Sequence, residues 1–232
     1  MNKTIIVINA EIQEEGKIVP ISPATETMVS SLKKAIKSSK INTEICIMAA
    51  ASLWSESLPP QSEETIYCPL TIELPESFVF PAQEIYQRCK NVVGLRQWVA
   101  TELGYRIITE KLGYPDFWLP VIVTSKGFIY GEVIGEGLIP YSCEQPIELP
   151  DQLRQPLYKL AYQLLSNLNA PSAVYLLQFS LQDREIVFNR LWPFPAAPAL
   201  ASLRVQEPDL YTCHWYCLTN QPIPEVIVKL LQ

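Results

Sequence analysis

Two apolar stretches separated by a short polar spacer constrain how the second half of this chain folds. Residues 173–181 and 185–191 are rich in β-branched, aromatic and aliphatic side chains, and three polar residues, 182–184, lie between them. Such side chains favour strands, and a polar spacer of this length is typical of a hairpin. We therefore expect the two stretches to pair antiparallel, with a helix over 151–168 packed on one face of the pair.

Three prolines follow the second stretch, at Pro193, Pro195 and Pro198. Proline lacks a backbone N–H, so the chain must leave the sheet there. The loop over 192–200 is apolar throughout, which leaves two interpretations open. If the loop is exposed, it is a candidate interface, because contiguous exposed apolar patches usually mark contacts. If it is buried, it covers a ligand cleft.

The first 80 residues predict a small parallel α/β unit. Strands are expected over 4–12, 45–51 and 65–74, and an amphipathic helix over 25–40 connects the first two. This strand–helix–strand order is typical of parallel α/β folds. No glycine-rich phosphate loop follows the first strand, so the sequence does not match a dinucleotide-binding fingerprint.

Residues 81–232 are expected to form a second, larger domain. Its first part, 82–112, is predicted to be largely helical with breaks near Gly94 and Gly104. A hairpin is expected within 121–134. The chain as a whole is therefore predicted to be α/β or α+β, with a carboxy-terminal sheet that has helices on one side.

Two polar residues are expected to begin helices in this larger domain. Asp151 precedes the apolar face of the helix over 151–168, and Asp209 precedes the aromatic run over 211–218. The second of these helices carries His214, the single histidine of the sequence. His214 lies beside Cys213 and near Cys217, but a tetrahedral metal site needs further ligands that no spaced pair supplies, so no metal is predicted.

Composition excludes several classes of protein. The chain is 48% hydrophobic with a net charge of −6, which predicts a real core and argues against a nucleic-acid partner. No apolar run approaches the roughly 20 residues of a membrane helix, and the amino-terminal segment does not resemble an export signal. The six cysteines lack paired spacing. A cytoplasmic protein with reduced cysteines is expected.

The carboxy-terminal half resembles the corresponding part of ATP-grasp enzymes. More narrowly, it is similar to the ATPase subunit of phosphoribosylaminoimidazole carboxylase, over about a third of the chain. The resemblance lies in four stretches that keep their order and spacing. These stretches are AVYLLQF at 173–179, FNRLWPFPAAPAL at 188–200, LYTCH at 210–214 and NQPI at 220–223. It implies that residues 81–232 form a truncated ATP-grasp-like domain.

The resemblance also implies where a metal would be held, and this sequence departs from the pattern there. The family uses two acidic residues to hold Mg²⁺ against the ATP phosphates, since a hard divalent ion prefers anionic oxygen ligands. Gln178 and Arg190 occupy those two positions here, and only Asn189 of the metal set remains. We therefore expect a degenerate, catalytically silent relative without catalytic residues, metal or cofactor.

Such a protein would act in binding, regulation or assembly. A protein partner, a small ligand and self-association all stay open, whereas nucleic acid and a membrane span are not expected. The candidate ligand or partner residues are Gln178, Asn189, Arg190, Trp192, Phe194 and His214.

A second hypothesis is a divergent ATP-dependent carbon–nitrogen ligase that uses ATP and magnesium. Its metal ligands would come from Glu132, Glu136 or Asp183. Lys111 and Lys126 lie in the region where the family binds ATP, although no motif supports either residue.

Overall fold

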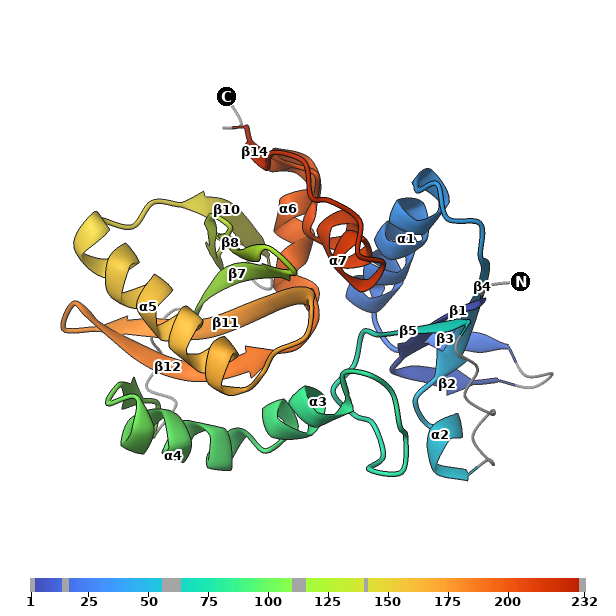
Figure 1. Cartoon of the computed structure of the whole chain (residues 1–232), viewed down its shortest axis with the longest axis horizontal. Coiled ribbons are helices and arrows are strands. Elements are labelled where there is room, and N and C mark those ends of the chain that lie inside the picture. The colour runs from blue at the N-terminus through green and yellow to red at the C-terminus, as the bar shows by residue number, and fades with distance from the viewer. Residues whose placement is uncertain (1–2, 14–16, 56–63, 110–115, 140–141, 230–232) are drawn as a thin grey trace.

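The computed structural model describes residues 3–13, 17–55, 64–109, 116–139 and 142–229. Two principal sheets, each covered by helices, make up these residues (Figure 1). The predicted α/β fold class, with a small amino-terminal strand–helix–strand unit, is therefore confirmed.

The smaller sheet has three parallel strands in the order β4-β1-β5. Its elements and the neighbouring ribbon are β1 (Lys3–Ile8), β2 (Ala10–Ile12), β3 (Ile18–Pro20), α1 (Pro23–Ser38), β4 (Glu44–Ala49), α2 (Ser52–Ser55) and β5 (Thr65–Pro69). Strand β1 is central and buried from Thr4 onward, as parallel strands covered on both faces require. The predicted strand over 4–12 is in fact two strands, because β2 leaves the sheet to pair with β3.

Two short helices, α3 (Gln83–Lys90) and α4 (Val92–Glu102), connect the sheets. The break between them lies at Asn91, three residues before Gly94, near which the sequence predicts it. The Asn91 side chain accepts a hydrogen bond from the Gly94 N–H at 3.0 Å and so caps the first turn of α4. Gly104 follows α4 with a φ of +72°, a left-handed conformation that favours glycine.

The larger sheet runs in the order β10-β9-β7-β11-β12-β6, with β8 paired to β7. Its strands are β6 (Arg106–Ile107), β7 (Phe117–Thr124), β8 (Gly127–Tyr130), β9 (Val133–Glu136), β10 (Cys143–Ile147), β11 (Ala173–Gln182) and β12 (Glu185–Trp192). Both predicted hairpins are confirmed, since β7–β8 and β11–β12 pair antiparallel. Asp183 and Arg184 form the second turn with φ values of 52° and 64°.

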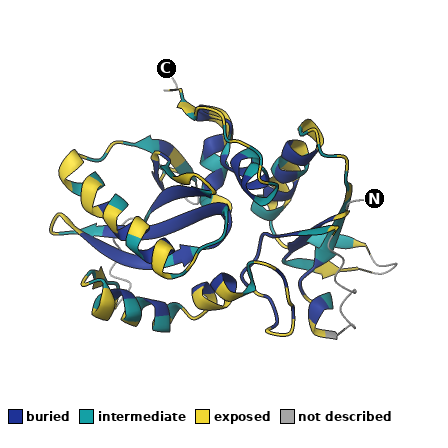
Figure 2. Ribbon diagram, viewed as in Figure 1, coloured by how far each residue is buried: buried dark blue, intermediate teal, exposed yellow. Residues whose placement is uncertain are grey.

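Helix α5 (Asp151–Asn167) packs against β12 with its apolar face and exposes its outer face (Figure 2). Its apolar stripe includes Leu157, Leu160 and Leu164, each fully buried. Asp151 is not the cap that we had expected. Pro150 occupies the N-cap position, and Asp151 is the first helical residue, bonded to Arg154.

The loop after β12 is buried. Phe194 is 3% exposed, and Ala199, in the short 3₁₀ helix η2 (Ala197–Ala201), is fully buried. This segment packs against α1, β10 and α7 (Leu210–Leu218). The interpretation of the loop as an exposed interface is therefore wrong, because its apolar side chains fill the space between the two sheets.

The last part of the described chain runs through α6 (Ser202–Val205), β13 (Gln206–Glu207), α7 and β14 (Ile227–Val228). Helix α7 lies beside α1, so a carboxy-terminal helix packs on the amino-terminal unit (Figure 1). None of the helices within the described ranges is long and apolar enough to cross a membrane. The domain boundary near residue 80 stays a prediction.

Asp209 begins α7 as predicted. Its carboxylate accepts hydrogen bonds from the N–H groups of Tyr211 at 2.9 Å and Thr212 at 3.1 Å.

We expect Asp209→Ala to lower the free energy of unfolding by about 1 kcal/mol, because two backbone donors lose their acceptor. Urea denaturation measures this change. Asp209→Asn is the matched control and should stay within a few tenths of a kcal/mol, since asparagine caps as well as aspartate. Equal losses in both variants would contradict the capping role.

His214 is buried in α7, and its Nδ1 accepts a hydrogen bond from the Val174 N–H at 3.1 Å. Burial lowers the pKa of His214 from 6.5 to about 3, because the charged imidazolium is poorly solvated there. The unfolded chain therefore binds a proton below pH ~6.5 that the folded chain does not bind. Stability is full above that pH and falls as the pH decreases towards 3.

We expect the free energy of unfolding to fall by roughly 2 kcal/mol between pH 7.5 and pH 5, at about 1.4 kcal/mol per pH unit below the unfolded pKa. Urea melts at both pH values measure it. In His214→Asn, whose side-chain oxygen can still accept from Val174, the loss over this interval should largely disappear. An unchanged pH dependence in that variant would show that other groups cause it.

Candidate functional site

Three of the strands of the larger sheet bring Trp118, Gln178 and Arg190 to the same level. Gln178 is the register partner of Trp118 on β7 and of Arg190 on β12. Directly opposed residues on paired strands present their side chains to the same face of a sheet, and Trp192 shares that face two residues beyond Arg190. We call Trp118, Gln178, Arg190 and Trp192 the sheet-face group.

Gln178, Arg190 and Trp192 contact one another through their side chains. The Trp192 indole N–H donates to the Gln178 side-chain oxygen at 3.1 Å. The Arg190 guanidinium lies 3.7 Å from the centre of the Trp192 ring, a close cation–π contact. Trp192 meets Phe194 edge-on at 6.0 Å, and Phe194 in turn stacks on Tyr86 of α3 at 5.9 Å. The structure thus brings together four of the six candidate residues.

Asn189 lies beside the group, at an irregularity in the pairing of β11 and β12. The Arg96 side chain of α4 donates to the Asn189 backbone oxygen at 2.7 Å and also to its side-chain oxygen. The Asn189 amide then donates to the Asp116 carboxylate at 3.1 Å. The sequence does not indicate either Arg96 or Asp116 as a site residue. Arg96 is 93 positions from Asn189 and Asp116 is 73 positions from it, and no local pattern links residues so far apart.

His214 does not join these residues. It belongs to α7 and contacts β11 at Val174, four residues before Gln178. Its Nδ1 accepts a hydrogen bond, so Nε2 carries the proton of the neutral ring. In the described part of the chain, no acceptor lies within hydrogen-bond distance of this Nε2. His214 is thus a buried packing residue with one unused donor.

Two arginines carry the positive charge at and beside the sheet-face group. Burial lowers the pKa of the Arg190 guanidinium; Cys89 and Glu73 raise it, whereas the nearby Arg96 cation lowers it. Burial also lowers the pKa of Arg96, although Asp116 opposes this shift. The Arg190 Nε and the Trp118 Nε1 are buried donors for which the described residues provide no acceptor. Neighbouring cations and unused donors suit the oxygens of an anion.

The same residues do not fit a magnesium ion. Gln178 already accepts a hydrogen bond from Trp192, and Arg190 places a cation where the second acid of the resemblance would lie. Mg²⁺ prefers anionic oxygen ligands in octahedral geometry, and a guanidinium provides none. Among the described residues, no three His, Cys, Asp or Glu side chains form a group that could hold a metal ion.

The three acids considered as replacement ligands do not converge on the group. Asp183 lies in the β11–β12 turn and forms an ion pair with Arg106 at 3.9 Å. Glu136 is at the end of β9, and Glu132 is just before that strand, both exposed and separated from β12 by β7 and β11. Lys126 lies in the β7–β8 turn, and Lys111 is outside the described residues. Strands β7 and β11 are hydrogen-bonded neighbours in one sheet, so the two predicted hairpins do not face each other across a ligand-binding cleft.

Comparison of sequences finds curated relatives along nearly the whole chain, although no family model matches. A formate-dependent phosphoribosylglycinamide formyltransferase of Prochlorococcus marinus strain MIT 9515 is 25% identical over 229 residues, which cover 93% of this chain and 57% of the relative. The enzyme of the same name from strain MIT 9313 is 24% identical, with 94% and 58% covered. The chain thus spans a little over half the length of these relatives.

Solved structures with the same fold include a synthetase and the ATPase subunit of a carboxylase. The N5-carboxyaminoimidazole synthetase of Staphylococcus aureus has a TM-score of 0.68 at 8% identity, covering 98% of this chain and 82% of that one. The phosphoribosylaminoimidazole carboxylase ATPase subunit of Aquifex aeolicus has a TM-score of 0.63 at 11% identity, with 98% and 79% covered. The expected ATP-grasp-like fold is confirmed, and the likeness extends well beyond the third of the chain that resembles the family in sequence.

These findings correct one prediction. The expectation of a catalytically silent binding, regulatory or assembly protein is contradicted, because the curated relatives are named as enzymes. These relatives come from bacteria. The departures at Gln178 and Arg190 are real, but they do not by themselves make the chain degenerate. The chain has the ATP-grasp-like fold, and its sequence is similar to that of formate-dependent phosphoribosylglycinamide formyltransferases.

Proposed function

We propose that this chain is a divergent ATP-dependent carbon–nitrogen ligase. The observation that carries the proposal is the similarity to named formyltransferases over 93% of the chain, which includes both sheets and the helices between them. By their name, those relatives use formate and phosphoribosylglycinamide. Among the solved structures of this fold, one is complexed with ATP and another with ADP and 5-aminoimidazole ribonucleotide. A small carboxylate, a phosphorylated amine and ATP are therefore the proposed substrates.

The sheet-face group supplies the chemistry that such substrates need for binding. Arg190 and Arg96 place two guanidinium groups close together, and the Trp118 indole adds a buried donor. A guanidinium pairs with phosphate or carboxylate oxygens through two parallel hydrogen bonds, and its charge strengthens both. These residues would bind and orient the anionic ends of the substrates. Asp116 and Asn189 would hold Arg96 in place through the hydrogen bonds already described.

No step of the proposed reaction is assigned to a metal at Gln178 and Arg190, because these side chains do not fit one. In this chain, a neutral amide and one arginine, Gln178 and Arg190, stand where the resemblance places two acids with a bound cation. The proposed reaction is thus still an ATP-dependent carbon–nitrogen ligation. At this position, the Arg190 guanidinium and not a metal cation would neutralise the charge of the phosphate. A cytoplasmic location and the lack of a nucleic-acid partner stay predictions.

Calorimetry with ATP, with and without Mg²⁺, tests the binding part of the proposal. We expect Arg190→Gln to weaken ATP binding by about tenfold or more, because a partly buried guanidinium–phosphate pair contributes more than an exposed one. Arg106→Gln is the matched control. Arg106 is a half-exposed arginine bonded to Glu185 at the far end of the same hairpin, and its loss should leave ATP binding unchanged. Equal effects in both variants would contradict a role for Arg190.

A coupled assay for ADP tests turnover. With formate and phosphoribosylglycinamide present, we expect the protein to release ADP from ATP. This release should stop when phosphoribosylglycinamide is left out, since a ligase couples ATP cleavage to formation of the carbon–nitrogen bond. Thermal melts with the same ligands provide a second measurement, because a ligand that binds only the folded state raises the melting temperature. The absence of both ADP release and any ATP-dependent shift would overturn the proposed function.

Charge reversal tests the assignment of Arg190 as an anion-binding residue. The double change Gln178→Glu with Arg190→Glu replaces a cation and a neutral amide by two carboxylates at opposed positions. We expect Mn²⁺ affinity to rise at least tenfold and metal-free ATP binding to be lost, because opposite charges attract strongly in a partly buried site. Calorimetry with Mn²⁺ alone measures the first effect. Unchanged Mn²⁺ and ATP affinities would show that these side chains do not face the ligand.

A further inference from the structure

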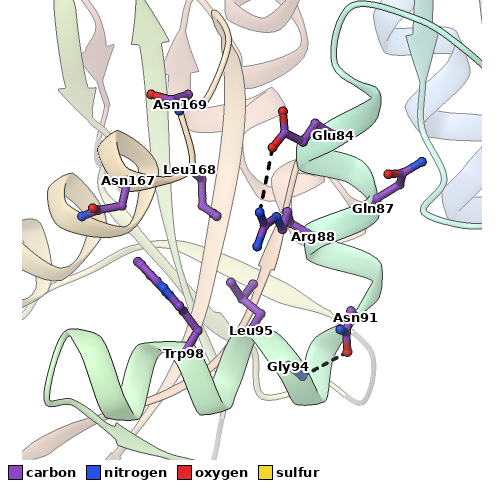
Figure 3. Close-up of a pocket in the computed structure, with 10 residues that line it drawn as sticks. All are labelled: Glu84, Gln87, Arg88, Asn91, Gly94, Leu95, Trp98, Asn167, Leu168 and Asn169. Carbon is purple, nitrogen blue, oxygen red and sulfur yellow. Dashed lines mark hydrogen bonds and ion pairs between the residues drawn. The ribbon is translucent and has the colours of Figure 1, made fainter.

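A cavity of about 780 Å³ lies between the helix pair α3–α4 and the carboxy-terminal end of α5 (Figure 3). This volume is within the range of small-molecule sites, roughly 300–1,000 Å³. Leu95 and Trp98 of α4 and the N-cap residue Asn91 line it, and they recur at the spacing of one helix face. No member of the sheet-face group lines the cavity, so the proposed ligase chemistry does not explain it.

Amide residues line this cavity from three segments. Gln87 comes from α3, Asn91 precedes α4, and Asn167 and Asn169 lie at and just after the end of α5. In Figure 3 the Gln87 side chain points away from the other lining side chains. The Asn91 oxygen is used by Gly94, and the Asn167 amide nitrogen donates to Gln163 at 2.8 Å. An amide offers donors and an acceptor side by side, and the NH₂ group of Asn91 and the oxygen of Asn167 remain available to a ligand.

An apolar surface lies between these amides. Leu95 is buried at its base, and Trp98 and Leu168 are half-buried. In Figure 3 the Trp98 indole extends from α4 towards Asn167 and Leu168. A tryptophan face bordered by amides suits a flat ring with polar edges, since the ring stacks on the indole while its edges form hydrogen bonds.

One cation also points into this space. Arg88 extends from α3 towards the end of α5, and its ion partner Glu84 is 4.0 Å away (Figure 3). The side chains of both residues are more than half exposed, at 63% and 84%, so their pairing contributes little. Arg88 can therefore exchange Glu84 for a phosphate, which a guanidinium binds more strongly through two hydrogen bonds.

We propose that this cavity is a second binding site, for an adenine nucleotide such as AMP. Trp98 stacks on the base, the amides pair with its edge, and Arg88 binds the phosphate. Adenine is favoured over guanine because asparagine and glutamine pair with the N6/N7 edge of adenine, whereas arginine and lysine pair with that of guanine. The site is distinct from the sheet-face group and does not depend on the ligase proposal.

Calorimetry of the whole chain with AMP, adenosine and GMP, in the absence of Mg²⁺, tests this site. AMP carries no phosphoryl group for a ligase reaction to transfer, so its binding is independent of turnover. We expect AMP to bind more tightly than adenosine, and GMP to bind at least fivefold more weakly than AMP. Failure of AMP to bind at 1 mM or below would overturn the second site and leave the ligase proposal untouched.

Variants place the ligand within the cavity. Trp98→Ala should weaken both AMP and adenosine by about fivefold or more, the usual effect of losing one base–aromatic stack. Arg88→Gln should weaken AMP alone, and Glu84→Gln should strengthen AMP alone, because each changes only the charge next to the phosphate. A melt of each variant confirms that it folds.

An exposed tryptophan and a partly exposed arginine outside the cavity are matched controls. Trp54→Ala removes a tryptophan of α2, and Arg154→Gln removes an arginine that is paired with Asp151 at the opposite end of α5. Both should leave AMP binding unchanged. If AMP binding responds to Arg190→Gln and not to Trp98→Ala or Arg88→Gln, the nucleotide binds at the sheet and the second site is refuted.

Discussion

Strand β11 is the element on which the rest of the larger sheet depends. It pairs with β7 over Ala173–Phe179 and with β12 over Leu176–Gln182, and Val174 to Phe179 is buried on both faces. A central strand bonded on both sides has a fixed register, because a slip by one residue would turn every side chain to the opposite face. This register places Gln178 level with Trp118 and Arg190. The position of the candidate site is thus a consequence of backbone pairing.

Charge decides what this site can hold. Burial is the main cause that lowers the pKa of Arg190, and repulsion from Arg96 adds to it, whereas Cys89 and Glu73 act in the opposite direction. Burial likewise lowers the pKa of Arg96, and Asp116 opposes that shift. The stack of Arg190 on Trp192 stabilises one cation by contact with the ring face. A cation added there would meet two positive groups, whereas an anion would relieve their repulsion. The chain shares its fold with a solved synthase complexed with ATP, and under the proposed function it would bind phosphate through arginine.

Local patterns made the hairpin over 173–191 and the helix start at Asp209 predictable, because strand propensity and capping act between residues close in sequence. Contacts between distant segments were not predictable. Arg96 reaches Asn189 across 93 residues, and nothing near either residue indicates this pairing. The sequence also did not indicate whether the apolar loop over 192–200 is buried or exposed. The space that Phe194 fills forms only when α3 and α7 pack in the folded chain. The helix break predicted near Gly94 lies at Asn91, because the Asn91 side chain caps the first turn of α4.

Helix α4 connects the two candidate sites. Arg96 and Trp98 are two residues apart, and two residues of an α-helix turn by about 200°, so the two side chains leave opposite faces of α4. Arg96 bonds to β12 on one face, while Leu95 and Trp98 line the cavity with the residues at the end of α5. The Asn91 cap holds the first turn and also lines that cavity. A shift of α4 upon binding of a ligand in the cavity would therefore move Arg96, and with it the Asn189–Asp116 hydrogen bonds beside the sheet-face group.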